Sequence, residues 1–184
     1  CARGYSVFTL DWRGQGLSDA LNGQPLKGHV NDYRDYLDDL DLFVRTVVST
    51  DDQEPERLII LGHSMGAHVG LRYCHDHPDQ VARAVFCGPL IKIETRRIPG
   101  AFSTIAARVI SALGLHTSYV PGRAAYWTAR QKFDGNPLTS DAHRYQIAAD
   151  WIDRNPKLAV GPPTIGWLSS MFRSFAVTHR PAYM

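Results

Sequence analysis

The first half of the chain alternates between short apolar runs and segments whose apolar residues recur at helical spacing. The apolar runs lie at 6–10, 57–61 and 81–87. Each is bounded by glycine, proline or polar clusters, which is typical of buried strands. Helical spacing extends over 30–47 and over about 65–75, and Pro78 ends the second of these segments. This order predicts βαβ units in a parallel sheet with right-handed crossovers.

The second half of the chain shows helical spacing alone. Apolar stripes predict a helix over 102–113 that Gly114 closes, a helix over about 140–153, and a last helix over about 165–175. Thr139 or Ser140 is the expected N-cap of the middle helix. Since no convincing strand follows Ile91, the pattern predicts an α/β layer over 1–90 and a helical segment over 91–184.

Composition narrows the class of protein. Apolar residues make up 44% of the 184 residues and charged residues 21%, which excludes a disordered, collagenous or coiled-coil chain. Twenty Lys and Arg against 18 Asp and Glu leave a net charge of +2 without a long basic run, so nucleic acid is not an expected partner. The longest aliphatic run, 58–61, is far too short to span a bilayer.

The cysteines and the acidic residues argue against a disulfide framework and a metal site. The three cysteines, Cys1, Cys74 and Cys87, are odd in number and show no CxxC spacing, as expected for reduced thiols in a cytosol. No signal peptide is visible, so we expect a cytoplasmic protein. Aspartates crowd the early half of the helix over 30–47. They predict a solvated face near the helix N-terminus rather than a metal site, because no histidine is spaced to complete one.

The strongest chemical signal is a glycine-serine-glycine turn between an apolar run and a helix. Gly62, Ser64 and Gly66 follow four aliphatic residues, and His63 and Met65 complete the turn. A turn this sharp strains the backbone of Ser64 and leaves no room for side chains at 62 and 66. It would present the Ser64 hydroxyl at the positive end of the next helix and the Met65 N–H to an oxyanion. The alternative is a tight turn with a buried serine.

Three stretches resemble a known family. Residues 11–18 (DWRGQGLS) resemble its D-x-R-G-x-G-x-S loop, and residues 62–66 (GHSMG) resemble its nucleophile elbow. Residues 136–141 (NPLTSD), with Arg144-Tyr145 and 161–168 (GPPTIGWL), resemble its cap segment. On these motifs the chain resembles the α/β hydrolases, specifically the bacterial lysophospholipase and monoacylglycerol lipase branch, which is similar to serine aminopeptidases.

The resemblance implies an α/β-hydrolase fold with a helical cap, truncated at both ends. Residues 1–90 would be a partial core holding the fourth to sixth strands of the family sheet, and 91–184 would be the cap or lid region. It implies Ser64 as nucleophile and the Met65 backbone N–H as oxyanion donor. The triad acid and histidine of the family would lie outside this chain, because none of its eight histidines matches the family position. We therefore expect an internal fragment that is inactive alone and, with a sheet edge exposed, poorly soluble.

The expected function is a serine hydrolase that cleaves lysophospholipid or monoacylglycerol esters through an acyl-enzyme, without a metal or organic cofactor. The same elbow also suits an acyltransferase or a proline-type aminopeptidase, and a non-catalytic, degenerate hydrolase is the alternative from another class. A serine at 64 disfavours an aspartate-dependent dehalogenase or epoxide hydrolase. The stripes over 102–113 and 167–175 suit an acyl chain or peripheral contact with a membrane, although core packing is their commoner cause. The pattern does not indicate an oligomeric state.

Overall fold

The chain forms two compact units in a computed structural model. The structure describes residues 4–24, 26–49, 58–93, 105–106, 109–120, 133–134, 136 and 139–183. One unit comprises Cys1–Leu10, Asp32–Ala106 and Ser169–Met184, and the other comprises Asp11–Asn31 and Ala107–Leu168. We call them the α/β unit and the helical unit. The predicted division into core and cap at residue 90 stays a prediction.

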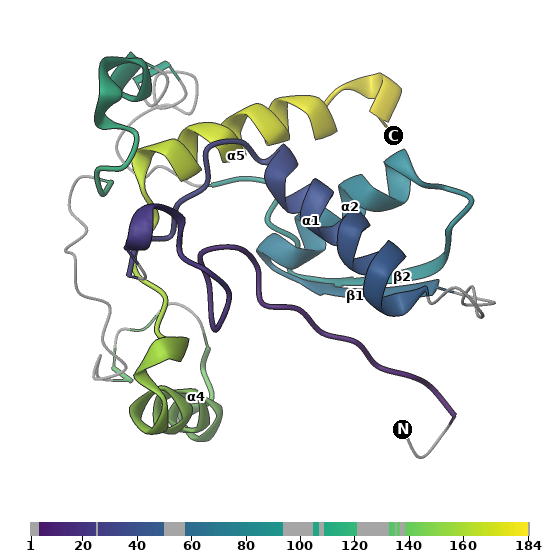
Figure 1. Cartoon of the computed structure of the whole chain (residues 1–184), viewed down its shortest axis with the longest axis horizontal. Helices are drawn as coiled ribbons and strands as arrows, with labels where there is room; N and C mark the ends of the chain where they lie inside the picture. Colours follow the sequence, from purple (N-terminus) through teal and green to yellow (C-terminus); the bar gives the residue numbers. More distant parts are fainter. Residues whose placement is uncertain are drawn as a thin grey trace. The chain divides into compact units, whose positions relative to one another are not determined.

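The α/β unit contains the parallel βαβ arrangement that the pattern predicts (Figure 1). Its elements are α1 (Arg34–Phe43), a π-helical turn at Val44–Val48, β1 (Leu58–His63), α2 (Met65–Asp76) and β2 (Val81–Cys87). β1 and β2 pair in parallel, with Leu61 opposite Val85 and His63 opposite Cys87. The predicted strands at 57–61 and 81–87 and the helix over 65–75 are therefore confirmed.

The predicted strand at 6–10 is wrong. These residues run as extended chain outside the sheet, which has two strands in the part of the chain that is described. Val7 is 68% exposed and Phe8 45% exposed, so the segment is also not buried. A β-rich run becomes a strand only where a neighbouring strand offers its backbone groups and an apolar surface. The pattern therefore reflects the β-propensity of this segment, and no strand pairs with it among the described residues.

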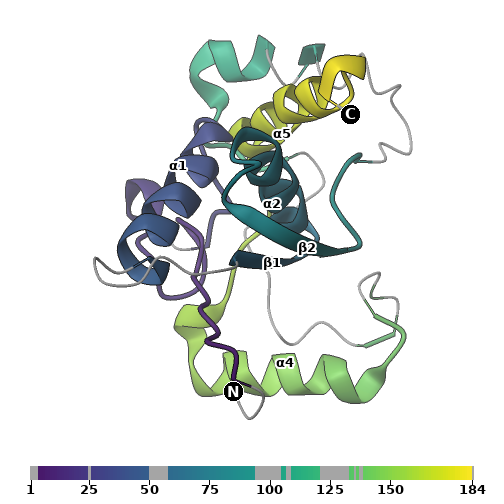
Figure 2. The same ribbon diagram turned by 90° about the vertical axis from the view of Figure 1, so that its right-hand side faces the viewer.

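The core of the α/β unit lies between the sheet and its helices. Figure 2 shows α2 over one face of the sheet, where Gly70 packs so closely that a Cβ atom would lie 2.8 Å from Phe86 Cε1 and 3.1 Å from Ile60 Cγ2. On the opposite face, Ile59, Leu61 and Val85 are exposed. The last helix, α5 (Ile165–Thr178), confirms the prediction over 165–175. Its buried residues Met171, Phe172 and Phe175 show that this stripe serves core packing.

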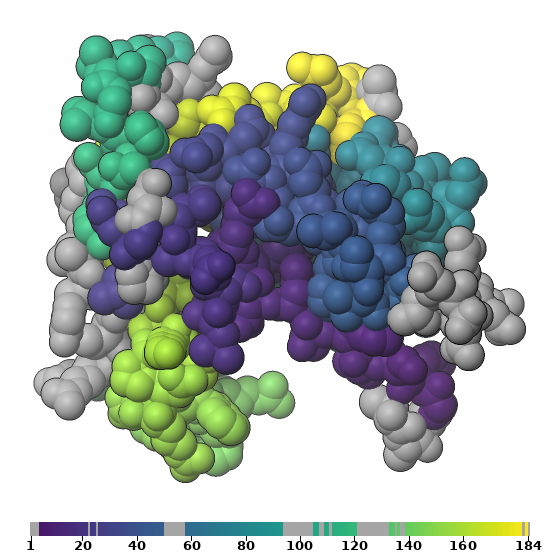
Figure 3. All heavy atoms as spheres, viewed as in Figure 1, coloured from purple at the N-terminus to yellow at the C-terminus, as the bar shows by residue number. Residues whose placement is uncertain are grey.

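The acidic helix α1 has an open outer side, which Figure 3 shows in blue. Tyr36 is its buried residue, and Asp38 is exposed. Asp41 forms an ion pair with Arg45, one turn further along, at 2.9 Å. Because the other aspartates of this helix are half-buried, its acidic face is only partly solvated, so the predicted solvated face is confirmed only in part.

The helical unit contains α4 (Ala142–Arg154), which confirms the helix predicted over 140–153. Its N-cap is Asp141, whose carboxylate accepts the Arg144 N–H at 3.1 Å, so the expected Thr139 or Ser140 cap is wrong. Of the predicted helix over 102–113, residues 105–106 and 109–110 are helical and lead into a π-helical turn at Ser111–Leu115. There Gly114 adopts a left-handed φ of 82°. Short 3-10 helices lie at Leu21–Gly23, Pro156–Leu158 and, in the α/β unit, Pro181–Tyr183.

Within the described ranges, none of the helices combines the length and the apolar composition needed to cross a membrane.

Candidate active site

Ser64 lies at the junction of β1 and α2 in a strained conformation. Its φ is 52° and its ψ is −118°, and within the described ranges no other non-glycine residue has a positive φ. The Ser64 N–H donates to the Cys87 carbonyl at 3.1 Å, and the Ser64 carbonyl accepts from Leu90 N at 3.0 Å and His68 N at 3.2 Å. Such a conformation costs about 1–3 kcal/mol and persists only when its surroundings over-determine it. Backbone hydrogen bonds on both sides of the turn supply that constraint.

Gly62 allows α2 to begin directly against the end of β1. A Cβ atom at this buried position would lie 2.7 Å from Ala67 Cα and 2.9 Å from Ala67 N. Both are backbone atoms of the helix, so they cannot rotate away as a side chain would. Position 62 therefore has no room for a side chain, and the glycine is required by close approach rather than by its φ. The corresponding expectation for Gly66 stays a prediction.

The half-buried Ser64 caps the positive end of a helix of 12 residues. The first N–H groups of a helix lack acceptors within it, and the summed peptide dipoles favour negative charge at this end. The Met65 N–H is the first of these groups. An oxyanion formed beside Ser64 would thus meet a favourable field without any rearrangement of the backbone. The catalytic roles of Ser64 and Met65 stay predictions.

Two further side chains flank the turn on the exposed face of the sheet. His63 ends β1 and is exposed, and its register partner Cys87 is exposed as well. A free cysteine is usually a buried, small hydrophobic residue. Cys87 is exposed instead, because its side chain lies on the face of the sheet that α2 does not cover.

The eight histidines all lie in described residues, and none of their side chains hydrogen-bonds to the Ser64 hydroxyl there. In the α/β unit, His68, His75 and His77 make structural contacts instead. His75 stacks on Tyr183 with ring centroids 3.7 Å apart, and His77 stacks on Tyr73 at 4.3 Å. His68 is fully buried and hydrogen-bonded to Ser174 through Nε2 at 2.8 Å. Burial lowers the pKa of His68 to about 4, with a smaller contribution from the charge of Arg72, so its ring is neutral at pH 7.

His29 has a structural role in the helical unit that the sequence did not indicate. Its Nδ1 lies 2.7 Å from Thr164 Oγ1 and its Nε2 lies 3.0 Å from Asn31 Oδ1. Burial lowers the pKa of this ring too. His29 lies before the acidic helix α1, which begins at Arg34, and does not open it. Gly166 leaves room for this ring, because a Cβ atom there would lie 2.7 Å from His29 Cε1.

The loop at 11–18 is held by its own side chains. Asp11 Oδ2 accepts the Leu17 N–H at 2.9 Å, and the Ser18 hydroxyl donates to the Asp11 carbonyl at 2.7 Å. Gly16 has a φ of 56°, and a Cβ atom there would lie 2.5 Å from Asp11 Cγ. The aspartate, the glycine and the serine of this motif are therefore explained by the local structure of the loop, which they hold together.

A strand, a serine with positive φ and a helix, set in a parallel sheet, have the backbone geometry of the nucleophile-elbow motif, and the fold is that of the α/β hydrolases. Solved structures share this fold. The monoacylglycerol lipase of Paleococcus ferrophilus is 18% identical with a TM-score of 0.56, covering 92% of this chain and 54% of that one. The thermostable carboxyl esterase of Bacillus coagulans is 18% identical with a TM-score of 0.60, covering 90% and 53%. At this identity the likeness shows the fold alone.

The chain belongs to the serine aminopeptidase S33 family, whose model matches residues 1–183. Two curated relatives are more similar in sequence than the solved structures. The probable lysophospholipase L2 of Haemophilus influenzae is 30% identical over 174 residues, covering 90% of this chain and 50% of the relative. Lysophospholipase L2 of Escherichia coli K12 is 31% identical over 168 residues, covering 90% and 47%. The chain thus spans about half the length of the curated relatives it matches.

Proposed function

We propose that this chain carries the nucleophile of a serine hydrolase that cleaves carboxylic esters of lysophospholipids or monoacylglycerols. The observation that carries the proposal is the strained Ser64 at the junction of β1 and α2. A protein keeps such strain where the chemistry uses it, because the turn lifts the hydroxyl out of the sheet edge. The names of the relatives, lysophospholipase L2 and monoacylglycerol lipase, supply the substrate class.

In this mechanism the Ser64 hydroxyl attacks the acyl carbonyl and its proton passes to a general base. The Met65 N–H and the dipole of α2 stabilise the negative oxygen of the tetrahedral intermediate. The protonated base then gives its proton to the leaving glycerol oxygen, and an acyl-enzyme remains. Water repeats the sequence and releases the fatty acid. The base and the acid that orients it belong, in this proposal, to sequence outside the 184 residues.

Exposed apolar side chains suit a lipid-like substrate or peripheral contact with its membrane. On α4, Ile147 and Trp151 lie one turn apart and are 44% and 58% exposed. In the π-helical turn at Ser111–Leu115, Leu113 and Leu115 are 72% and 51% exposed. Exposing side chains of this size to water is unfavourable, and burying them against an acyl chain is favourable.

The first prediction tests the nucleophile in the full product of the gene that encodes this chain. Ser64→Ala removes the attacking oxygen, so kcat/KM for release of fatty acid from lysophosphatidylcholine or a monoacylglycerol should fall about 10⁴-fold or more. The unfolding midpoint should stay near that of the wild type. Ser140→Ala, which removes an exposed hydroxyl before α4, is the matched control and should keep full activity. Turnover retained in Ser64→Ala would contradict the assignment.

A second candidate keeps the elbow and changes the bond or the acceptor. The description of the family as serine aminopeptidases favours a test with peptide substrates. Turnover of a proline amide above turnover of the esters would assign peptidase chemistry. Competition of an added alcohol or amine with water for the acyl-enzyme would instead indicate acyl transfer. A non-catalytic role predicts no labelling of Ser64 by a fluorophosphonate, whereas either enzyme predicts labelling that Ser64→Ala abolishes.

A further inference from the structure

Arg72 is a buried cation without a counter-charge in the part of the chain that is described. Its side chain is 9% exposed, and its Nη1 donates to Ser174 Oγ at 3.1 Å. Its Nε is buried and has no hydrogen-bond partner, and no carboxylate lies within ion-pair distance among the described residues. Removing a guanidinium from water costs several kcal/mol unless an opposite charge compensates it. The fold therefore maintains an unbalanced positive charge at this point.

The groups that contact the Arg72 guanidinium in the described structure are neutral. The ring of Tyr33 lies 5.8 Å from Arg72 Cζ, and the neutral His68 shares Ser174 with the guanidinium. The hydroxyls of Tyr33 and Ser170 and the Nδ1 of His68 are also buried without a partner in the described structure. If the Ser174 hydroxyl, which accepts from Arg72, donates to Nε2 of His68, then Nδ1 of that ring carries a proton. The unpartnered atoms are then able to donate.

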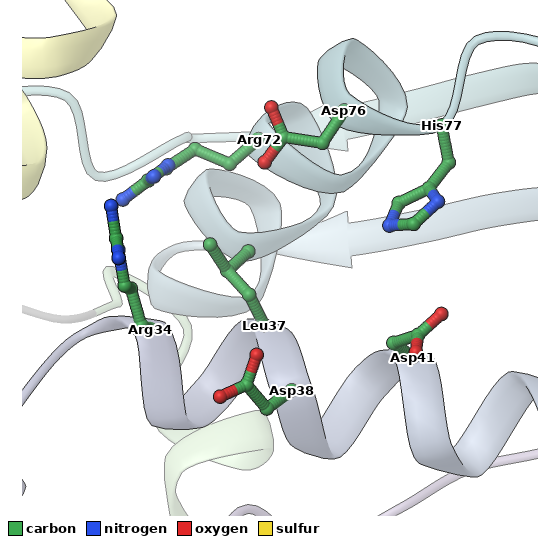
Figure 4. A pocket seen from close by; sticks show the side chains of 7 residues that line it. All are labelled: Arg34, Leu37, Asp38, Asp41, Arg72, Asp76 and His77. Carbon is green, nitrogen blue, oxygen red and sulfur yellow. The ribbon is translucent and has the colours of Figure 1, made fainter.

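Arg72 also lines a cleft of about 500 Å³ between α1 and α2 (Figure 4). The guanidinium of Arg34, from the first turn of α1, points to the same end of this cleft as that of Arg72. Three aspartates line the cleft as well. Asp41 forms an ion pair with Arg45 at 2.9 Å, and Asp76 is hydrogen-bonded to His75 Nδ1 at 2.9 Å. Asp38 lies on α1 one turn after Arg34. The two arginines form the cationic end of the cleft.

We propose that Arg34 and Arg72 form a binding site for a tetrahedral oxyanion, the phosphate group. Two guanidiniums directed at one place repel each other. An anion bound between them would offset this repulsion and would supply the counter-charge that Arg72 lacks. Each guanidinium presents a planar fork of N–H groups that matches two phosphate oxygens. Arg34 is exposed, so the site is open to solvent on the α1 side and closed by the buried cluster on the α2 side. The proposal does not depend on catalysis by Ser64.

The test titrates inorganic phosphate into this chain at constant ionic strength, with chloride as the balancing anion, and follows binding by calorimetry. The wild type and Ser64→Ala should each bind phosphate saturably, with the same single dissociation constant. Arg34→Gln should raise the dissociation constant about tenfold, because one charge-assisted pair of hydrogen bonds is lost. Arg144→Gln is the matched control, since it removes the same charge from a side chain that is 82% exposed in the helical unit. It should bind as the wild type does.

A wild type without saturable binding, or an Arg34→Gln variant with an unchanged midpoint, would overturn the site. Arg72→Gln is a second test variant. Where this variant is folded, it should bind no phosphate. Glycerol 3-phosphocholine distinguishes the source of the group, because it carries the phosphodiester of a lipid headgroup. Tighter Arg34-dependent binding of this diester assigns a headgroup site, and tighter binding of inorganic phosphate assigns a free-phosphate site.

Discussion

At the scale of single residues, the geometry around Ser64 depends on whether a residue is enclosed by backbone atoms or by side chains. Ser64 holds its positive φ because Cys87 and Leu90 fix both of its peptide groups. Gly62 is enclosed by the backbone of Ala67, whereas Gly70 in α2 is enclosed by the side chains of Ile60 and Phe86. A side chain can rotate or shift by a few tenths of an ångström, but the start of a helix moves only as a whole. The two glycines therefore differ in how much a methyl group should cost.

Gly62→Ala should destabilise the chain more than Gly70→Ala does. At Gly62 the added Cβ meets backbone atoms at 2.7 and 2.9 Å, and overpacking of this kind costs about 1–3 kcal/mol. At Gly70 the neighbours can yield, and alanine recovers roughly 1 kcal/mol of helix propensity. Urea unfolding monitored by circular dichroism measures both changes. Equal losses in the two variants would show that α2 can shift against β1.

The buried His68 should make stability depend on pH in a defined window. Its pKa is about 4 in the fold and 6.5 in the unfolded chain. Between these values the unfolded state binds a proton that the folded state does not, so stability falls as the pH drops from 6.5 to 4. The loss amounts to roughly 3 kcal/mol and is absent above pH 7.

His68→Gln removes this titration and keeps a side chain that can hydrogen-bond to Ser174. Its free energy of unfolding should change less than that of the wild type between pH 7 and pH 4. His143→Gln, at an exposed position in α4, is the control and should follow the wild-type curve. His29 titrates in all three proteins, so the comparison isolates His68. Parallel curves for wild type and His68→Gln would contradict the lowered pKa.

At the scale of elements, local signals predicted what local interactions determine. β1, α2, β2, α4 and α5 each carry their own periodicity and end at glycine, proline or a capping residue, and all five were predicted. The elbow was found because its glycines, its serine and the flanking strand and helix are contiguous in sequence. The strand at 6–10 failed because pairing depends on a neighbour elsewhere in the chain. The N-cap of α4 was misplaced because several residues before it can accept the same N–H group.

Contacts between distant segments had no comparable signal. His68 and Arg72 meet Ser174 across 106 and 102 residues, and His29 meets Thr164 across 135. Serine, histidine and arginine at helical spacing look like surface residues in a sequence, and only packing shows that they are buried. The buried cluster and the phosphate site proposed on it therefore required the structure, whereas Ser64 did not.

At the scale of the whole molecule, the unusual feature is a parallel sheet with a bare face. Parallel sheets are normally covered on both faces, and their strands are apolar on both sides for that reason. Here α2 covers the face of Ile60 and Phe86, while Leu61 is 76% exposed, Val85 52% and Ile59 44%. Leu61 and Val85 are register partners, so these side chains form a continuous apolar patch. A patch of this kind promotes association in water.

The chain studied alone should therefore self-associate through this patch. Sedimentation velocity should show a mass that rises with concentration, and the double variant Leu61→Glu, Val85→Lys should remain monomeric at the same concentrations. The charges sit on adjacent strands at opposed positions, so they attract each other and leave β1 and β2 paired. Leu42→Lys removes one exposed apolar side chain from α1, which is 53% exposed and outside the sheet, and should not reduce association. A monomeric wild type would contradict this prediction, and an equal effect of Leu42→Lys would show that exposed apolar area in general, rather than the bare face of the sheet, drives association.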